Sequence, residues 1–303
     1  MRLPRLQLLG LALCLACLQV SLEGRELRVA SYNLRNYLCM DRLVDGRFRR
    51  DYPKPEAEKR VVRETIRSVS PDLLAVQEIG SLALLEELRD DLAREGLFYE
   101  GLFVLEAEDD VRKVGALWKS ELSVEPAEHA SLGFTFFGRP KEVKRGMLEL
   151  RVEDPSAPFS VFVLHLKSKY TDDERDHQSS VRRTREAQAA RERILDLYPD
   201  PSQSRFMVVG DLNDGPNSSA VRRFLARGEL TIAEPLDLRD SHGLEWTHYF
   251  VKDASYSRID YMLFSPALLR ASGPTGAIVS RPDYYEGSDH RLIWADLTFP
   301  SAD

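Results

Sequence analysis

Cysteine is scarce in this chain, which has only three among its 303 residues. Two of them, Cys14 and Cys17, lie in the N-terminal segment, so Cys39 has no partner except Cys17 if the chain is cleaved after Ala16. A disulfide framework is therefore not expected, even in an oxidising compartment. Cysteine and histidine also lack the spacing that holds structural zinc, so no zinc-stabilised domain is expected.

Flexible linkers, low-complexity tracts and internal repeats of a fixed period are absent as well. Their absence argues against a repeat protein and leaves one large domain as the simplest organisation. Such a domain can bury a sizeable core, because 43% of the residues are hydrophobic.

The chain also lacks an excess of positive charge. It has 42 Lys and Arg against 49 Asp and Glu, which gives a net charge of −7. A protein that holds nucleic acid through its overall electrostatic field is usually basic, so this mode of binding is not expected. A local basic patch remains compatible with the composition.

The first twenty residues differ from the rest. Arg2 and Arg5 precede an apolar run, 6–18, that is too short to cross a bilayer comfortably. We expect residues 1–24 to be a secretory signal and residues 25–303 to form the mature domain. A buried N-terminal helix or strand is the alternative interpretation.

Two outcomes of signal processing are compatible with the sequence, release of the mature protein or lipid anchoring. Cys17 directly follows Ala16, which resembles a bacterial lipoprotein box, although Cys14 stands where such boxes usually carry leucine. Cleavage near Ala16/Cys17 is therefore expected, followed by release as a secreted or periplasmic protein or by lipid anchoring at the cell envelope.

Hydrophobic periodicity predicts alternating strands and helices, which is typical of the mixed α/β class. Strands are expected at 27–33, 71–78, 98–105, 114–118, 122–125, 146–152, 159–164, 205–209, 257–264 and 292–299. Helices are expected at 56–69, 82–94, 180–197 and 221–226. The polar segment 35–59 is expected to be a surface loop up to the first helix, and the dense charges of 167–193 to form solvated pairs.

Polar side chains stand where several of these strands end. The stretch Gly210–Pro216 follows a buried strand and places Asp211 and Asn213 at the lip of a sheet. Oxygen and amide groups at such a lip suit a phosphate and a hard cation, whereas an ordinary turn is the alternative. Glu78 and His165 end two other strands in the same way.

Six strings of this kind occur in a fixed order along the chain. They are Ser-Tyr-Asn-Leu at 31–34, Val-Gln-Glu at 76–78, Leu-His-Leu-Lys-Ser at 164–168, Gly-Asp-Leu-Asn-Asp at 210–214, Arg-Ile-Asp-Tyr at 258–261 and Ser-Asp-His at 288–290. In that order the chain resembles the endonuclease/exonuclease/phosphatase superfamily, which includes DNase I-like nucleases, neutral sphingomyelinases and inositol polyphosphate 5-phosphatases. The resemblance implies a four-layer sandwich of two packed, mostly antiparallel β-sheets flanked by helices, with the site at one edge.

The resemblance also implies a metal site. Glu78 corresponds to the principal metal carboxylate, with Asn33 and Asp289 as direct or water-mediated ligands. A set of oxygen ligands favours Mg²⁺ or Mn²⁺ over zinc, with Ca²⁺ as a further candidate. For Glu78 alone, a structural ion pair is the alternative.

The same resemblance assigns roles in catalysis. His290 is the candidate general base, since an ordinary pKa near 6.5 allows a neutral imidazole at working pH, and Asp260 would fix its tautomer. His165 and Asn213 would donate to the non-bridging phosphoryl oxygens. For Asp211 three roles remain open: orienting water, protonating the leaving group or binding metal.

Three basic residues are the substrate-binding candidates. Arg145 resembles the family's substrate-side arginine, with a surface ion pair as the alternative, and Lys167 and Lys169 follow His165 closely. The remaining histidines are expected to be structural or solvated: His129, His177, His242 and His248.

Three functions fit these residues. We expect a secreted, metal-dependent phosphodiesterase that acts on nucleic acid, because the string at 165–169 resembles that of secreted bacterial nucleases and Arg145, Lys167 and Lys169 can meet a phosphodiester backbone. The protein is expected to be a monomer, and no protein partner is indicated. A phospholipid (sphingomyelinase-like) or small phosphoester hydrolase, such as one acting on inositol phosphates, is the second hypothesis. An inactive binding protein that keeps the fold is the third, which the retained carboxylates and histidines argue against.

Overall fold

The computed structural model describes residues 25–154, 157–171 and 173–299. The expected signal segment 1–24 and its cleavage site therefore lie outside the described residues. None of the helices within the described ranges is both long and apolar enough to span a bilayer.

Two six-stranded sheets form the centre of the molecule. The first has the order β19 (Thr275–Ile278), β20 (Ile293–Phe299), β1 (Arg25–Tyr37), β4 (Leu73–Ile79), β6 (Lys113–Trp118) and β5 (Gly101–Val104). The second has the order β15 (Glu234–Pro235), β18 (Asp260–Phe264), β12 (Phe206–Asp211), β11 (Phe159–His165), β10 (Met147–Val152) and β7 (Val124–His129). Each sheet contains one parallel pair, β1 with β4 and β11 with β12, and its other pairings are antiparallel.

The two sheets pack face to face over a common apolar core. Strand residues of period two supply it, such as Val29 and Ala75 from the first sheet and Leu150, Val161 and Val209 from the second. All five are fully buried. The inward-facing apolar side chains therefore fix which face of each sheet meets the other.

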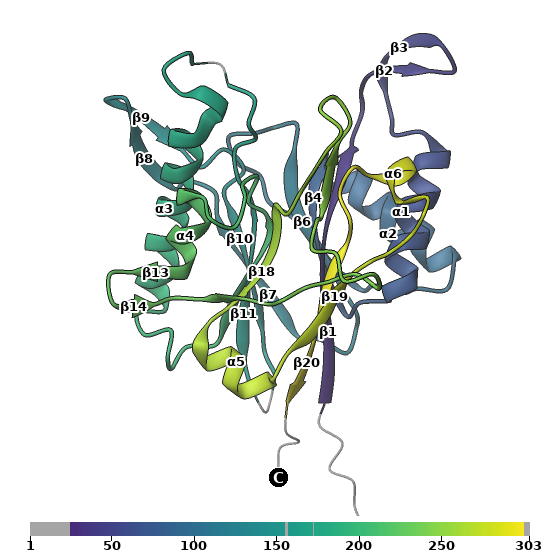
Figure 1. The fold of residues 1–303 in the computed structure, drawn as a ribbon. Coiled ribbons are helices and arrows are strands. Elements are labelled where there is room, and N and C mark those ends of the chain that lie inside the picture. Colours follow the sequence, from purple (N-terminus) through teal and green to yellow (C-terminus); the bar gives the residue numbers. More distant parts are fainter. Residues whose placement is uncertain (1–24, 155–156, 172, 300–303) are drawn as a thin grey trace, which may run out of the picture.

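Helices cover both outer faces (Figure 1). The first sheet carries α1 (Glu56–Val69) and α2 (Leu82–Arg94), with the short α6 (Tyr284–Gly287) packed against α1, and the second carries α3 (Ser180–Leu197) and α4 (Ser219–Leu225). A seven-residue helix, α5 (Pro266–Ser272), follows β18. The helix–sheet–sheet–helix arrangement confirms the predicted four-layer sandwich.

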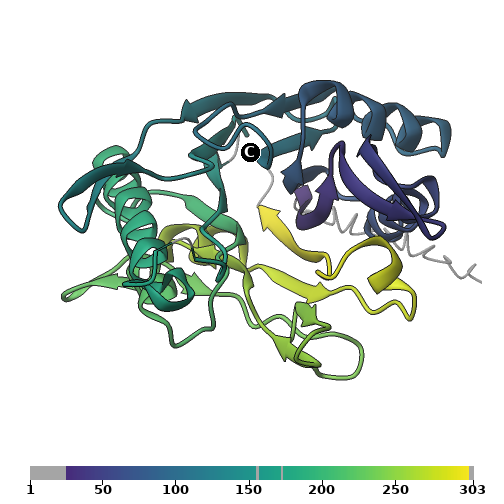
Figure 2. The ribbon, with the colours of Figure 1, turned by 90° about the horizontal axis from the view of Figure 1, so that it is seen from above.

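The two parallel pairs bring the site to one edge. Asn33 lies opposite Gln77 where the regular pairing of β1 with β4 is interrupted, and His165 lies opposite Asp211 where β11 and β12 end. Because β18 runs antiparallel to β12, its first residue, Asp260, pairs with Asp211 at the same edge. Figure 2 looks onto this edge from above.

The segment expected to be a loop, 35–59, is more regular than predicted. Strand β1 continues to Tyr37, and β2 (Met40–Val44) and β3 (Arg47–Tyr52) form a hairpin that projects at the rim (Figure 1). Its turn is formed by Asp45 and Gly46, both with positive φ, as a two-residue type I′ hairpin requires. The loop prediction was wrong because neither face of this hairpin is buried, so no hydrophobic alternation marks it.

Several short elements were not predicted, among them the edge strands β15 and β19, the helices α5 and α6 and a 3-10 turn at His177–Ser179. Six very short strands outside the main sheets were not predicted either. They are β8 (Gly133–Phe136), β9 (Arg139–Glu142), β13 (Ala226–Arg227), β14 (Leu230–Thr231), β16 (His248–Phe250) and β17 (Ser255–Ser257). Each has two to four residues and forms a two-stranded ribbon outside the main sheets. Strands this short carry too few residues for a period-two pattern to appear.

The charges on α3 are only partly solvated, contrary to expectation. Arg185 is exposed, but Arg182, Arg183 and Glu186 are buried. Arg183 pairs with Asp214, with Nε and Nη2 both 3.0 Å from Oδ2. It thereby ties the helix to the loop that carries the Gly-Asp-Leu-Asn-Asp string, a contact that spacing on the helix alone does not predict.

Candidate active site

A cleft of about 910 Å³ opens at the edge where the central strands end. Six of the predicted site residues line it directly: Glu78, His165, Asp211, Asn213, Asp289 and His290. The basic candidates Arg145, Lys167 and Lys169 line it as well. Asn33 and Asp260 lie just behind, hydrogen-bonded to Asp211 and His290. The structure thus brings together all eleven residues selected from the sequence.

His290 and Asp260 form a buried pair. The Nδ1 atom of His290 lies 2.9 Å from Oδ2 and 3.1 Å from Oδ1 of Asp260. Thr247 positions the aspartate, since its hydroxyl accepts the backbone N–H of Asp260 at 3.1 Å. Ser288 positions the histidine, since its hydroxyl accepts the His290 N–H and donates to the Asn33 carbonyl. Asp260 contacts only Nδ1, so the Nε2 atom of His290 is left for contacts with a ligand in the cleft.

The carboxylates around His290 change its protonation. Burial lowers the pKa of His290, but the Asp260 and Asp211 carboxylates outweigh it and raise that pKa to about 10. The ordinary pKa near 6.5 that the sequence suggests is therefore too low for His290 among these carboxylates. A divalent cation bound nearby would lower this pKa and release the proton.

Asp211 lies at the centre of the site. Its Oδ2 atom accepts hydrogen bonds from the amides of Asn33 at 3.0 Å and Asn213 at 3.2 Å. The same oxygen lies 3.6 Å from Nε2 of His165 and 3.7 Å from Nε2 of His290. Burial raises the pKa of Asp211 to about 7. Among the residues that the structure describes, Asp211 is thus the carboxylate that faces both His165 and His290.

The backbone around Asp211 depends on a glycine. Gly210 has φ +130, and a Cβ built there would lie 2.0 Å from the Leu164 carbonyl oxygen on the neighbouring strand. Only glycine permits this approach of β12 to β11. Asn213 then adopts φ 55, a left-handed conformation that asparagine tolerates, and its N–H donates to Oδ1 of Asp211 at 2.8 Å.

His165 is a neutral, buried donor at the end of β11. Burial, and then the charge of Arg145, hold the pKa of His165 well below its usual range. Its Nε2 atom lies between Asp211 and Glu78, 4.0 Å from Oε1 of the latter. Its Nδ1 atom has no hydrogen-bond partner among the described residues. A neutral ring held in this way can donate a hydrogen bond without carrying charge.

Glu78 occupies a strained position at the end of β4. Its φ is +60, in the left-handed region, and the pairing of β4 with β6 is irregular between Gln77 and Ile79. Its Oε2 atom accepts the Asn36 N–H at 2.8 Å and lies 3.9 Å from Nε of Arg112. A left-handed glutamate costs about 1–3 kcal/mol of backbone strain, which is typical of functional sites.

The donor atoms fit a hard divalent cation. Glu78 presents a carboxylate to the cleft, and Asp289 presents another that is about a third exposed, 29%. Asn33 contributes an amide that already accepts the Arg35 N–H at 2.9 Å. Carboxylate and amide oxygens with room for water match what Mg²⁺ and Mn²⁺ prefer. The predicted ligands are therefore compatible with the metal predicted for them.

Two of the basic candidates, Arg145 and Lys167, are held by hydrogen bonds to neighbouring residues. Arg145 is buried, with Nε 2.9 Å from Oδ2 of Asp109 and Nη1 donating to the Leu166 carbonyl at 3.3 Å. Lys167 is buried too, and its Nζ donates to the Tyr170 carbonyl. Both hold the loop that follows His165. Lys169, by contrast, is exposed at the cleft.

His248 belongs to the site although sequence reasoning assigned it no role. It lies on β16, lines the cleft, and its ring centroid is 4.6 Å from that of His290. Burial, with the charge of His290, lowers the pKa of His248 to about 4. The two residues also form an isolated β-bridge. Only its position ten residues before the Arg-Ile-Asp-Tyr string could have pointed to it.

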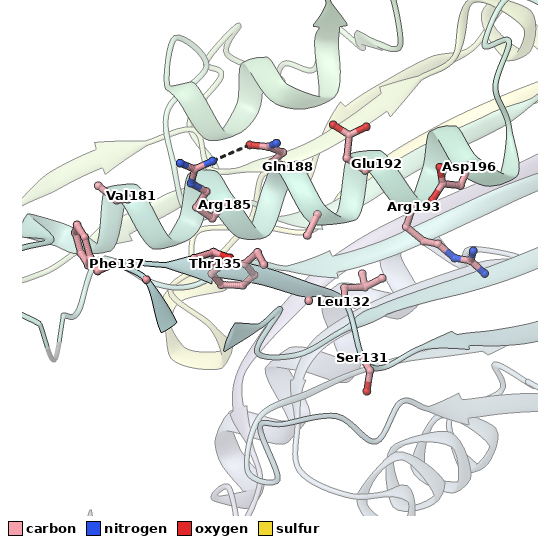
Figure 3. A pocket seen from close by; sticks show the side chains of 14 residues that line it. Ser131, Leu132, Thr135, Phe137, Val181, Arg185, Gln188, Glu192, Arg193 and Asp196 are labelled. Carbon is pink, nitrogen blue, oxygen red and sulfur yellow. Dashed lines mark hydrogen bonds between the residues drawn. The ribbon is translucent and has the colours of Figure 1, made fainter. Parts of the chain in front are cut away.

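The other three histidines agree with expectation. His129 is buried and bonded to Glu149 at 3.0 Å, while His177 and His242 are exposed. A second hollow, of about 750 Å³, lies between α3 and the β8–β9 ribbon and contains none of the predicted site residues. There Nη1 of Arg185 donates to Oε1 of Gln188 at 3.3 Å, a hydrogen bond drawn as a dashed line in Figure 3.

Comparison with known proteins gives one family. The sequence model of the Endonuclease/Exonuclease/phosphatase family matches residues 30–290. No curated protein sequence gives a significant match.

Several solved structures share the fold. The human Nocturnin catalytic domain with bound sulfate is 16% identical, with a TM-score of 0.61 over 90% of this chain and 94% of that one. Sphingomyelinase C from Streptomyces griseocarneus is 16% identical, with a TM-score of 0.59 over 90% of this chain and 100% of that one. Truncated Caenorhabditis elegans TDP2 is 16% identical, with a TM-score of 0.59 over 91% and 99%. Identities this low establish the fold and not the substrate.

Proposed function

The chain belongs to the endonuclease/exonuclease/phosphatase family of divalent-metal-dependent phosphoester hydrolases, and from that membership and the charge of the cleft we propose that it is a phosphodiesterase acting on nucleic acid. The supporting observation is a local excess of positive charge. Seven basic residues line the cleft: Arg35, Arg112, Lys144, Arg145, Lys167, Lys169 and Lys252. Four acidic residues line it: Glu78, Asp211, Asp253 and Asp289.

This local excess reverses the balance of the whole chain. The cleft has seven basic against four acidic residues, whereas the sequence has 42 against 49. A polyanionic backbone is attracted to a positive cleft in an otherwise acidic protein, because the field is focused where the substrate binds. The negative net charge therefore does not argue against a nucleic-acid substrate.

The side chains supply proton transfer and hydrogen bonding. His290 takes the proton of the attacking water through Nε2, while Asp260 holds Nδ1 and stabilises the imidazolium that forms. His165, neutral and buried, donates to a non-bridging phosphoryl oxygen. Glu78, Asn33 and Asp289 would hold a divalent cation, which would neutralise charge on the phosphoryl group.

Asn213 can donate to the substrate only by exchanging a bond. Its two amide hydrogens point to the Leu166 carbonyl at 3.0 Å and to Oδ2 of Asp211 at 3.2 Å. The longer bond is the one we propose to exchange for a phosphoryl oxygen. For Asp211, the donors that converge on it favour an orienting role among the three roles considered.

Salt dependence tests the substrate. Binding of single-stranded or duplex nucleic acid should weaken with salt, with a log–log slope of about −0.7 to −0.9 per phosphate neutralised. Lys169→Ala should make that slope shallower by about one contact and slow nucleic-acid cleavage, while hydrolysis of a small bis-aryl phosphodiester is unchanged. Lys141→Ala, exposed on β9 away from the cleft, is the matched control.

Lys167→Ala should behave differently from Lys169→Ala. Because Lys167 braces its own loop, its loss should slow both substrates and not nucleic acid alone. Nucleic acid left uncut with Mg²⁺, Mn²⁺ and Ca²⁺, while sphingomyelin or an inositol phosphate is hydrolysed, would replace the nuclease with the second hypothesis. A folded protein that hydrolyses none of them would leave only the inactive binding protein.

We also propose that the protein is exported. Arg2, Arg5 and the apolar run 6–18 support a cleaved signal. Intact-mass measurement after expression in an export-competent bacterial host should show a chain that lacks the N-terminal segment. Diacylation at Cys17 would identify the anchored form, and an intact Met1 would contradict export.

A further inference from the structure

Nitrogen and oxygen ligands gather on one side of the cleft in a second set, which shares only Asp289 with the oxygen set of Glu78 and Asn33. His248, Asp289 and His290 each offer one ligand atom, and these three atoms lie within 4.8 Å of one another. Ligands of a tetrahedral zinc ion, each about 2 Å from the metal, lie about 3.4 Å apart. A small closure of side chains is enough to bring the three atoms onto one ion.

Both histidines are oriented as metal ligands usually are. The Nδ1 atom of His248 lies 3.3 Å from the Ser257 hydroxyl, and its Nε2 atom lies 3.9 Å from Oδ2 of Asp289. The Nδ1 atom of His290 is held by Asp260 at 2.9 Å, which leaves its Nε2 atom for a ligand. Metal-binding histidines typically bond one ring nitrogen to a carboxylate or other acceptor and present the other to the metal.

The backbone holds these residues in place. His248 and His290 face each other across an isolated β-bridge, and the Tyr249 N–H donates to the Asp289 carbonyl at 3.0 Å. On the other side of the bridge, the Arg291 N–H donates to the Thr247 carbonyl at 2.7 Å. The two ligand-bearing segments therefore cannot drift apart without breaking main-chain hydrogen bonds. Arg35, 3.7 Å from Asp289, is the one cation that competes for this carboxylate in the described contacts.

We propose that His248, Asp289 and His290 form a transition-metal site that takes Zn²⁺, and that zinc bound there inhibits the enzyme. Two imidazoles and a carboxylate are a zinc donor set, whereas the oxygen ligands at Glu78 suit Mg²⁺. Zinc on Nε2 of His290 blocks the atom that accepts the proton from water. The inhibitory part rests on the proposed hydrolytic function, while the binding part does not.

Zinc binding is tested by calorimetry on the untagged protein without its signal, with Zn²⁺ alone as the ligand. His248→Ala should weaken Zn²⁺ binding at least about tenfold. His242→Ala, which removes an exposed histidine outside the cleft, and Glu78→Gln, which alters the oxygen site, should leave it within twofold. Visible absorption of Co²⁺ in the same variants reports tetrahedral nitrogen ligation independently of activity.

Inhibition is measured separately, as Zn²⁺ titrated into the Mg²⁺-supported hydrolysis of a bis-aryl phosphodiester. The half-inhibitory Zn²⁺ concentration should rise at least tenfold in His248→Ala and stay unchanged in His242→Ala. Zn²⁺ binding that is equal in wild type and His248→Ala, or absent from wild type, would overturn the site. Tight binding at His248 without inhibition would overturn the inhibitory role, and absence of all hydrolysis with binding retained would count against the proposed function instead.

Discussion

Replacing His290 with alanine should lower kcat at least about a hundredfold, because general acid–base catalysis contributes on the order of 10² to 10⁴. The loss should appear mainly in kcat, with KM little changed, since proton transfer is an interaction of the transition state. His290 is positioned for this by contacts on both sides, to Asp260 at Nδ1 and to the Ser288 hydroxyl through its N–H. Rates are measured on nucleic acid and on a bis-aryl phosphodiester.

Asp260→Asn separates orientation from charge at the same pair. The amide can donate to Nδ1, so it favours the tautomer with the proton on Nε2, where the base must be unprotonated. This variant should therefore lose most of the activity that His290→Ala loses, although the imidazole is still present. His242→Ala is the matched control, because it removes an exposed histidine. Near wild-type rates in both variants, with unfolding transitions unchanged, would exclude the pair as the base.

The sheets and the strand-end residues were predictable from the sequence for a physical reason. Strands such as 159–164 and 205–209 are buried on both faces, so they appear as continuous apolar runs, and a polar residue after such a run is conspicuous. His165 and Asp211 were found in this way, and the parallel pairing of β11 with β12 then places them side by side. The helices at 56–69, 82–94 and 180–197 agree with α1, α2 and α3 at both ends.

The parts that could not be predicted depend on contacts between distant segments. His248 reaches the site only because β16 folds back on β17 and places its ring against His290. Arg183 on α3 looks like a solvated charge until Asp214, 31 residues later, is brought against it. The protonation of His290 likewise reflects three-dimensional neighbours, since Asp260 and Asp211 come from two different strands. Local pattern carries none of this information.

The β2–β3 hairpin was not predicted for a different reason, since a local signal for its turn is present in the sequence. Asp45-Gly46 is a strong local signal for a two-residue hairpin, and it was available in the sequence. Its arginines and aspartates suggested a solvated loop, and the hairpin is indeed largely exposed, with Leu43 75% and Phe48 65% accessible. The Asp-Gly turn signal therefore favours a hairpin here, even though neither face of the hairpin is buried.

Chelation by EDTA should abolish activity, and Mg²⁺ or Mn²⁺ should restore it, because the carboxylates that line the cleft need a cation to bring a phosphodiester among them. Glu78→Gln should lower kcat on the order of a hundredfold or more, since a metal ion is worth several kcal/mol of transition-state stabilisation and each 1.4 kcal/mol is about tenfold. Glu106→Gln, an exposed carboxylate paired with Lys113, is the matched control. Full activity in the presence of EDTA would contradict the assignment of a catalytic divalent cation.

Backbone strain at Glu78 makes the metal prediction separable from a folding defect. With φ at +60, alanine at this position keeps the strain of a left-handed side chain, whereas glycine relieves it. Glu78→Gly should therefore unfold at a higher denaturant concentration than Glu78→Ala, and yet both should be inactive. Raising Mg²⁺ should partly restore Glu78→Gln, because the remaining amide oxygen is a weaker ligand, and should not restore His290→Ala. Two outcomes would contradict this: failure of Mg²⁺ to restore any activity to Glu78→Gln, or an active Glu78→Gly variant. In either case Glu78 serves to hold the backbone turn, and the cation binds elsewhere in the cleft.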